Sequence, residues 1–262
     1  MTALTASPPV AAPPGGRGHA VPSYARGKPY SGRHPIIARD GWGMVALFVI
    51  GTLVLGAGAW WLHPIAGAVV GVVGLLLTLW CLWFFRDPER AVPSEPGAII
   101  CPADGVLIKV EPGVPPAELG LAPEQTHGMT KLSIFMNVFN VHVNRSPAKA
   151  RVARIAYHPG AFFNASFDKS SELNERCSHA LELDDGRTIA MVQIAGLVAR
   201  RIVVKVDEGS TLRAGERYGL IRFGSRVDLY VPEGFVLRAT LGDKTVAGST
   251  VLGTLPGAGG AA

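Results

Sequence analysis

Hydrophobic and polar positions divide the chain into three stretches. The first is rich in Pro, Gly, Ser and Ala, and its formal charges are basic until Asp40. The second carries no formal charge between Gly43 and Phe85, and in the third short β-branched runs alternate with turn residues. The pattern predicts a flexible basic tail over residues 1–40, a helical segment over 41–86 and a β-rich domain over 87–262.

The uncharged stretch is long enough to cross a bilayer twice. One crossing needs roughly 20 apolar residues, and His63-Pro64 is the clear interruption. The pattern predicts a transmembrane hairpin of residues 43–62 and 65–85, in which a GxxxG pair, Gly67 and Gly71, would let the helices approach closely. Two buried core helices are the alternative, but the stretch is too long for them. Basic residues outside both ends predict that both ends lie in the cytoplasm.

The third stretch has the sequence pattern of a compact β domain, with short β-branched runs separated by turn residues. In residues 227–231 the apolar positions 227, 229 and 231 share one face, whereas Asp228 takes the other. The predicted fold class is α+β and mostly β, with a hammerhead-like C-terminal half. That half is similar to a biotinyl or lipoyl domain but lacks the attachment lysine. The candidate strands are 98–100, 105–110, 131–135, 142–143, 150–157, 179–182, 188–194, 201–205, 217–221, 225–230 and 235–239.

Composition narrows the partners. Hydrophobic residues make up 48% and charged residues 17% of the chain, and the net charge of +5 favours anionic partners. Because a bilayer-spanning segment is predicted, the anionic partner is expected to be a lipid surface, and no nucleic-acid module stands out. The three cysteines show no CxxC spacing, which suits a reducing compartment. Histidines and acids lack metal-ligand spacing, so no metal is predicted.

Several short motifs follow one another along the chain. They are Phe84-Phe85-Arg86-Asp87-Pro88, Pro102-Ala103-Asp104-Gly105, residues 135–147, Tyr157-His158-Pro159-Gly160, Asn174-Glu175-Arg176 and residues 219–228. In this order they resemble the short phosphatidylserine decarboxylases of bacteria, over roughly residues 80 to 240. The agreement of separate motifs in one order argues against chance.

The resemblance implies an enzyme that makes its own electrophile. Loss of the carboxylate from an amino acid leaves a carbanion, which needs an electron sink joined to the amine through a Schiff base. In this family the sink is a covalent pyruvoyl group (pyruvate), which here would arise when the Ser225 hydroxyl attacks the carbonyl of Gly224. Self-cleavage would leave a heterodimer of residues 1–224 and 225–262. The reaction would convert phosphatidylserine to phosphatidylethanolamine and CO2.

By the same resemblance, His142 is the base that activates Ser225, and Asp104 orients that base. Longer relatives carry a second histidine where this chain has Arg145. This departure leaves His158 and His127 as alternative bases and Arg145 as a secondary candidate.

A second Gly-Ser pair competes for the cleavage site. Gly248-Ser249-Thr250 copies the triplet that longer relatives cleave. A cut there would leave only residues 249–262, a Gly- and Ala-rich tail with few strand residues to hold a pyruvoyl group. The flanks of Gly224 match the short family, so Ser225 is favoured.

Substrate contacts and location follow from the same resemblance. Lys169, Arg176 and Arg226 are candidates to neutralise the substrate phosphate, although each is equally readable as a surface charge. Residues 160–163 would either admit lipid tails or belong to the core. The expected partners are phosphatidylserine and anionic membrane lipids, and a higher oligomer is left open. The expected location is the bacterial inner membrane, with the catalytic domain on the cytoplasmic side.

A related pyruvoyl decarboxylase that acts on a soluble amino acid is a near alternative, which the predicted membrane anchor disfavours. Two functions of other kinds also remain open. One is a membrane-bound hydrolase that uses Ser225, His142 and Asp104 as a triad, although no GxSxG elbow is present. The other is a non-enzymatic, membrane-anchored adaptor with the same fold, for which the Arg145 departure leaves room.

Overall fold

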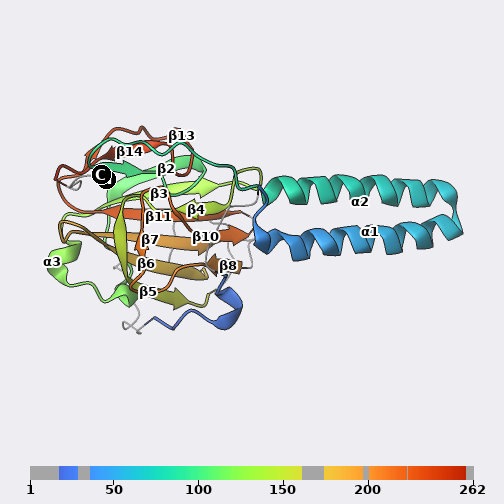
Figure 1. Cartoon of the computed structure of the whole chain (residues 1–262), viewed down its shortest axis with the longest axis horizontal. Coiled ribbons are helices and arrows are strands. Elements are labelled where there is room, and N and C mark those ends of the chain that lie inside the picture. The colour runs from blue at the N-terminus through green and yellow to red at the C-terminus, as the bar shows by residue number, and fades with distance from the viewer. Residues whose placement is uncertain (1–17, 29–35, 161–173, 197–200, 223, 258–262) are drawn as a thin grey trace, which may run out of the picture.

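The computed structural model consists of a helical hairpin that projects from one end of a β-rich domain (Figure 1). The predicted fold class, α+β and mostly β with a hairpin before the β domain, is confirmed. Lys169 and residues 161–163, which the sequence singled out, lie outside the described residues. The structure describes residues 18–28, 36–160, 174–196, 201–222 and 224–257.

Two apolar helices form the hairpin, α1 (Trp42–Leu62) and α2 (Pro64–Phe84). Pro64 opens α2 at its first position, where its missing N–H costs nothing, and Nδ1 of His63 accepts a hydrogen bond from the Ile65 amide at 3.3 Å. With 21 residues, each helix is about 30 Å long, which matches the apolar thickness of a bilayer. Both spans are long and apolar enough to cross a membrane, and only 6% and 11% of their apolar windows are buried.

The helices approach each other at Gly67 and Gly74. A Cβ at Gly67 would meet the backbone of Trp60, and one at Gly74 would meet the side chain of Thr52. Gly71 has open space around it instead. The close-approach pair is therefore Gly67 and Gly74, two turns apart on one helix face, and not the predicted Gly67 and Gly71.

The described residues of the β domain form three antiparallel sheets. The large sheet has the order β13-β2-β3-β11-β7-β6-β5-β9, and the smaller sheets are β4-β10-β8 and β1-β14-β12. A short helix, α3 (Pro123–Thr126), lies at the end of the domain opposite the hairpin (Figure 1). The strands are β1 (Ala98–Ile100), β2 (Gly105–Pro112), β3 (Thr130–Met136), β4 (Val143–Arg145), β5 (Ala150–His158), β6 (Arg176–Leu183), β7 (Thr188–Ala195), β8 (Arg201–Val204), β9 (Thr211–Leu212), β10 (Arg217–Arg222), β11 (Ser225–Val231), β12 (Val236–Leu237), β13 (Lys244–Thr245) and β14 (Val251–Thr254).

Strand β11 is central in the large sheet and alternates as the sequence predicted. Val227, Leu229 and Val231 join the main hydrophobic core, which also takes residues from β10 and β8 of the smaller sheet. Tyr230 points to the other face and belongs to a separate cluster. Ser225, at the start of the strand, is therefore on the core face.

The hairpin stands on the sheet β4-β10-β8. Phe84 and Phe85, where α2 ends, pack against Val143 of β4, Val203 of β8 and Leu220 of β10. Burial of these apolar side chains fixes the end of the hairpin against the strands that lead to Gly224 and follow His142.

Part of the predicted flexible tail is ordered against the β domain. His19 and Tyr157 exchange two backbone hydrogen bonds of 2.9 Å, and the Gly27 amide donates to the Val204 carbonyl at 2.7 Å. Ala25 is fully buried. Residues 18–28, within the predicted tail, pair with the edges of β5 and β8, because these edges offer backbone groups to a short segment.

Candidate functional site

The connection from β10 to β11 holds the Gly224–Ser225 peptide. Gly224 has φ +65°, in the left-handed region that a residue with a Cβ rarely adopts. A Cβ there would meet open space, so the backbone angle is what requires glycine. Ser225 begins β11 and is fully buried.

Two groups from distant parts of the chain contact Gly224. The Gly196 amide, just after β7, donates to the Gly224 carbonyl oxygen at 3.1 Å. The Gly224 amide donates to Nε2 of His142 at 3.3 Å. The carbonyl that Ser225 would attack thus already has a hydrogen-bond donor, as an oxyanion site requires.

The orientation of His142 is set by its own loop. Its Nδ1 lies 2.9 Å from the Asn140 carbonyl oxygen. Since a carbonyl can only accept, Nδ1 carries the proton, and the Nε2 electron pair accepts the hydrogen bond from the Gly224 amide. The backbone of His142 is bound to β10, because the Ile221 N–H donates to the His142 carbonyl oxygen at 3.2 Å.

His142 is neutral at physiological pH. Burial lowers its pKa to about 4, the Asn140 hydrogen bond opposes this shift, and the charge of Arg86 lowers the pKa further. The ring also packs on Phe84, with centroids 4.3 Å apart. A neutral imidazole with a directed Nε2 can accept a proton.

The Ser225 hydroxyl points to a polar chain inside the core. Its Oγ donates to the Met136 sulfur at 3.4 Å, and the Asn144 side-chain nitrogen lies 3.7 Å from the same sulfur. The Gln193 amide donates to Asn144 Oδ1 at 2.8 Å. All are buried and uncharged. The sequence reasoning missed these residues, although amide side chains within buried strands were a usable signal.

Asp104 does not hydrogen-bond to His142. Its Oδ2 pairs with Arg90 at 2.8 Å, and its Oδ1 accepts from the Ala247 amide at 2.7 Å. Burial raises the pKa of Asp104, while the Ala247 amide and Arg90 oppose this. The contact that holds His142 Nδ1 comes from the Asn140 carbonyl, whereas the two Asp104 oxygens contact Arg90 and the Ala247 amide.

Arg145 occupies a structural ion-pair cluster. Its guanidinium contacts Asp87 at 3.3 Å and the Gly215 and Pro88 carbonyl oxygens at 3.1 and 2.9 Å. Arg217 holds the same Asp87 at 2.8 Å. Arg145 therefore clamps the segment that follows the hairpin onto β4 and β10.

The other predicted side chains lie elsewhere. His158 ends β5 and shares its row of the large sheet with Arg176 and Arg226, which face away from Ser225. Arg176 pairs with Glu118 at 2.7 Å, and Arg226 pairs with Asp228 at 2.8 Å.

The competing serine, Ser249, is not placed like Ser225. Its Oγ donates to the Ala91 carbonyl at 2.9 Å in an exposed turn, after Gly248 with φ +75°. Within the part of the chain that the structure describes, no histidine ring forms a hydrogen bond with Gly248 or Ser249.

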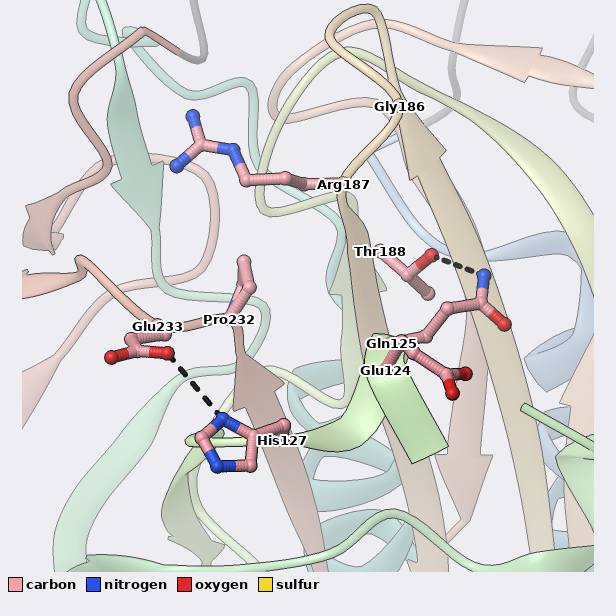
Figure 2. Close-up of a pocket in the computed structure, with 8 residues that line it drawn as sticks. All are labelled: Glu124, Gln125, His127, Gly186, Arg187, Thr188, Pro232 and Glu233. Carbon is pink, nitrogen blue, oxygen red and sulfur yellow. Dashed lines mark hydrogen bonds and ion pairs between the residues drawn. The ribbon is translucent and has the colours of Figure 1, made fainter. Parts of the chain in front are cut away.

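A pocket of about 300 Å³ lies at the far end of the domain (Figure 2). His127 pairs there with Glu233 at 3.5 Å, and Gln125 donates to Thr188 at 3.2 Å. Pro232 and Glu233 follow the end of β11, whereas Ser225 begins it, so the pocket and the Gly224–Ser225 peptide are at opposite ends of one strand. His127 is thus remote from this peptide. Across the described ranges, no cluster of His, Cys, Asp and Glu is arranged to hold a metal ion.

Comparison with known proteins places the chain in a family. The family model described as phosphatidylserine decarboxylase matches residues 77–253. Three relatives bear the name phosphatidylserine decarboxylase proenzyme. The protein of Ruegeria pomeroyi is 57% identical over 72% of this chain and 84% of its own length. That of Cereibacter sphaeroides is 55% identical over 71% and 79%. That of Paramagnetospirillum magneticum is 48% identical over 86% and 89%. The chain therefore belongs to the phosphatidylserine decarboxylase family of carboxy-lyases.

Proposed function

We propose that the chain converts phosphatidylserine to phosphatidylethanolamine and CO2 with a pyruvoyl group that it makes by cutting its own Gly224–Ser225 bond. The observation that carries this proposal is the pair of contacts on Gly224. His142 Nε2 lies 3.3 Å from the amide nitrogen, and the Gly196 N–H lies 3.1 Å from the carbonyl oxygen.

Self-cleavage begins when Ser225 Oγ turns from Met136 to the Gly224 carbonyl carbon, a change of side-chain rotamer. His142 Nε2 takes the hydroxyl proton and passes it to the Ser225 nitrogen as the C–N bond breaks. The Gly196 N–H stabilises the charge that develops on the carbonyl oxygen. An ester then joins Gly224 to Ser225 Oγ.

The ester is resolved by elimination. His142, the neutral base beside this peptide, removes the α-proton of residue 225 while the Gly224 carboxylate leaves from Cβ. The remaining enamine becomes an imine, which water hydrolyses to a ketone with release of ammonia. The pyruvoyl group so formed would supply a carbonyl electrophile for the substrate amine and an electron sink for the decarboxylation. His142 is then placed to return a proton to the α-carbon.

The fold supports a stable heterodimer after this cut. Strand β11 lies between β3 and β7 and pairs with both along its length. Strands β13 and β14 pair with β2 and β1. Residues 225–262 would remain bound through these ladders, with residue 225 held at the start of β11.

The location of the site suits a lipid substrate. Arg222, at the end of β10, donates to the Asp40 carbonyl at the start of the hairpin at 2.9 Å, so the site lies beside the hairpin base. A diacyl lipid stays in the bilayer, and the enzyme must reach it there. Basic residues at both hairpin ends, including Arg39 and Arg86, support a cytoplasmic domain on the bacterial inner membrane and contact with anionic lipids.

The test is chain composition and activity of the full-length protein purified from membranes. We expect two chains on a denaturing gel, and a mass for the smaller chain that corresponds to a pyruvoyl terminus at residue 225. Ser225→Ala should leave one inactive chain, whereas the matched control Ser249→Ala should be cleaved and active. Decarboxylation by an intact chain would contradict the proposal, and labelling of an intact chain by a fluorophosphonate would favour the hydrolase.

A further inference from the structure

The turn between β3 and β4 presents a large apolar side chain to the outside. Phe139 is 64% exposed. The turn is closed by its own asparagines: Asn140 Oδ1 accepts from the Asn137 amide at 2.9 Å, and Asn137 Oδ1 accepts from the Phe139 amide at 2.8 Å. These bonds make a defined turn that holds Phe139 at its tip.

This turn is tied to the end of α2. Arg86 donates through Nη2 to the Phe139 carbonyl and through Nη1 to the Trp83 carbonyl, both at 2.8 Å. The Arg86 guanidinium also lies 4.3 Å from the centre of the Trp83 ring. Trp83 is 57% exposed. Trp42, at the start of α1, is 53% exposed, and Ile36, before that helix, is 80% exposed. Phe139 thus continues an exposed apolar belt around the hairpin base.

We propose that Phe139 enters the headgroup region of the bilayer and is a third membrane contact, made by the β domain itself. The proposal rests on the membrane anchoring proposed above. Where a helical hairpin leaves the apolar layer, tryptophan side chains lie at the interface, and exposed phenylalanine side chains of interfacial segments enter the boundary between headgroups and acyl chains. The Arg86 hydrogen bond places Phe139 at that level.

The same turn carries the base of the proposed reaction. Asn140, the neighbour of Phe139, orients His142 through its carbonyl oxygen. Phe139 is thus connected to the Gly224–Ser225 peptide through Asn140 and His142. A bilayer that receives Phe139 therefore lies close to this peptide. We infer that the contact brings lipid headgroups to the site in addition to holding the domain.

A lipid surface is favoured over a protein partner by continuity with the spans. The belt joins directly to helices whose outer faces are almost entirely exposed. Arg86, which contacts the turn, would attract anionic lipids. A second copy of the chain or another protein is an outcome that the experiment distinguishes.

The first test measures depth in nanodiscs that contain anionic lipid. A nitroxide is attached to Phe139→Cys and, as a matched control, to Val114→Cys. Val114 is 72% exposed and follows β2 at its far end, where Pro112 pairs with Thr130. The native cysteines are buried, and the labelled parent protein supplies their background. We expect the label at 139 to relax with oxygen more than with a water-soluble nickel complex, and the label at 114 to do the reverse. A water-exposed label at 139, or spin–spin broadening between copies, overturns the proposal.

The second test separates this contact from the reaction. For Phe139→Asp, we expect the ratio of rates on vesicle-borne and monomeric short-chain phosphatidylserine to fall about tenfold, as loss of a buried aromatic side chain implies. Phe139→Leu should restore most of the ratio, and Val114→Asp should leave it unchanged. An unchanged ratio in Phe139→Asp overturns the proposal. Loss of self-cleavage in Phe139→Asp also overturns it, because Phe139 would then be needed for the reaction itself. Failure of the parent protein to cleave or decarboxylate would reject the proposed function, whereas the depth measurement would still decide the membrane contact.

Discussion

The two faces of strand β11 bury polar groups of opposite kinds. On the outer face, Arg226 and Asp228 form an ion pair at 2.8 Å beside the pair of Arg176 and Glu118. On the core face, Ser225 donates to the Met136 sulfur, and the amide of the preceding Gly224 contacts a histidine whose pKa is lowered to about 4, chiefly by burial. One face holds paired charges, and the other holds a neutral base.

The difference shows how one strand serves stability and chemistry at once. A buried charge persists when a partner compensates the loss of water. A proton acceptor instead must be in its neutral form, so its surroundings must disfavour the charged form. Alternation along β11 lets both conditions hold at adjacent residues.

The largest expected effect is on the core face. His142→Ala should slow self-cleavage by about 10²- to 10⁴-fold, because it removes the general base. The measurement is the rate of chain separation on denaturing gels after synthesis. His127→Ala is the matched control, since that ring is 81% exposed at the far end of the domain, and it should cleave at the parent rate. Equal rates for the two variants would remove His142 from the reaction.

On the outer face, loss of a charge should affect stability and leave the chemistry in place. Glu118→Gln in the uncleaved Ser225→Ala background should lower the free energy of unfolding by about 3 kcal/mol, because Arg176 stays buried without its carboxylate. Asp184→Asn breaks an exposed pair with Lys149 and should change it by less than about 0.5 kcal/mol. Denaturant unfolding of both variants checks this. If both variants lower the free energy of unfolding by a similar small amount, burial does not strengthen the contribution of the Arg176–Glu118 pair to stability.

The two faces should also differ in their response to acid. Burial alone would raise the pKa of Glu118, but the hydrogen bond and charge of Arg176 lower it overall. Its contribution to stability is present above the ordinary glutamate pKa and is lost as pH falls through the lowered value. In Ser225→Ala this acid loss should be visible in unfolding curves, and Glu118→Gln should lack it.

For His142 the lowered pKa sets the pH range of the reaction. The cleavage rate should stay level down to about pH 5 and then fall as the pH passes through about 4, because Nε2 becomes protonated. Stability should decline between the ordinary histidine pKa of 6.5 and about 4, because the unfolded chain binds a proton that the folded chain does not. A cleavage rate that falls near pH 6.5 would show an unshifted base.

The smallest expected effect concerns Met136. Met136→Leu keeps the volume but removes the sulfur that accepts from Ser225 Oγ. Because the hydroxyl must leave this sulfur before it attacks, we expect self-cleavage to be faster by no more than about threefold, the scale of one weak hydrogen bond. Timed denaturing gels measure it, and a large decrease in rate would mean that the sulfur contact holds Ser225 in place for attack.

The sequence by itself determined the parts that depend on local pattern. The predicted helices at 43–62 and 65–85 agree with α1 and α2 within a residue at each end, since length and absence of charge are properties of the segment alone. Alternation in residues 227–231 was readable for the same reason. The motif order led to the family, and Gly224–Ser225 remains the proposed cleavage site.

Only the tertiary structure decided which groups meet at that peptide. His142 and Gly224 are 82 positions apart, and the Gly196 donor comes from a third segment. Their contact depends on the register of β10 against β4 and of β11 against β7, which no local pattern encodes. The same holds for Asp104 on Arg90 and for Arg145 on Asp87. Each polar group forms hydrogen bonds with the donors and acceptors that folding brings near it. Residue type alone does not identify these partners.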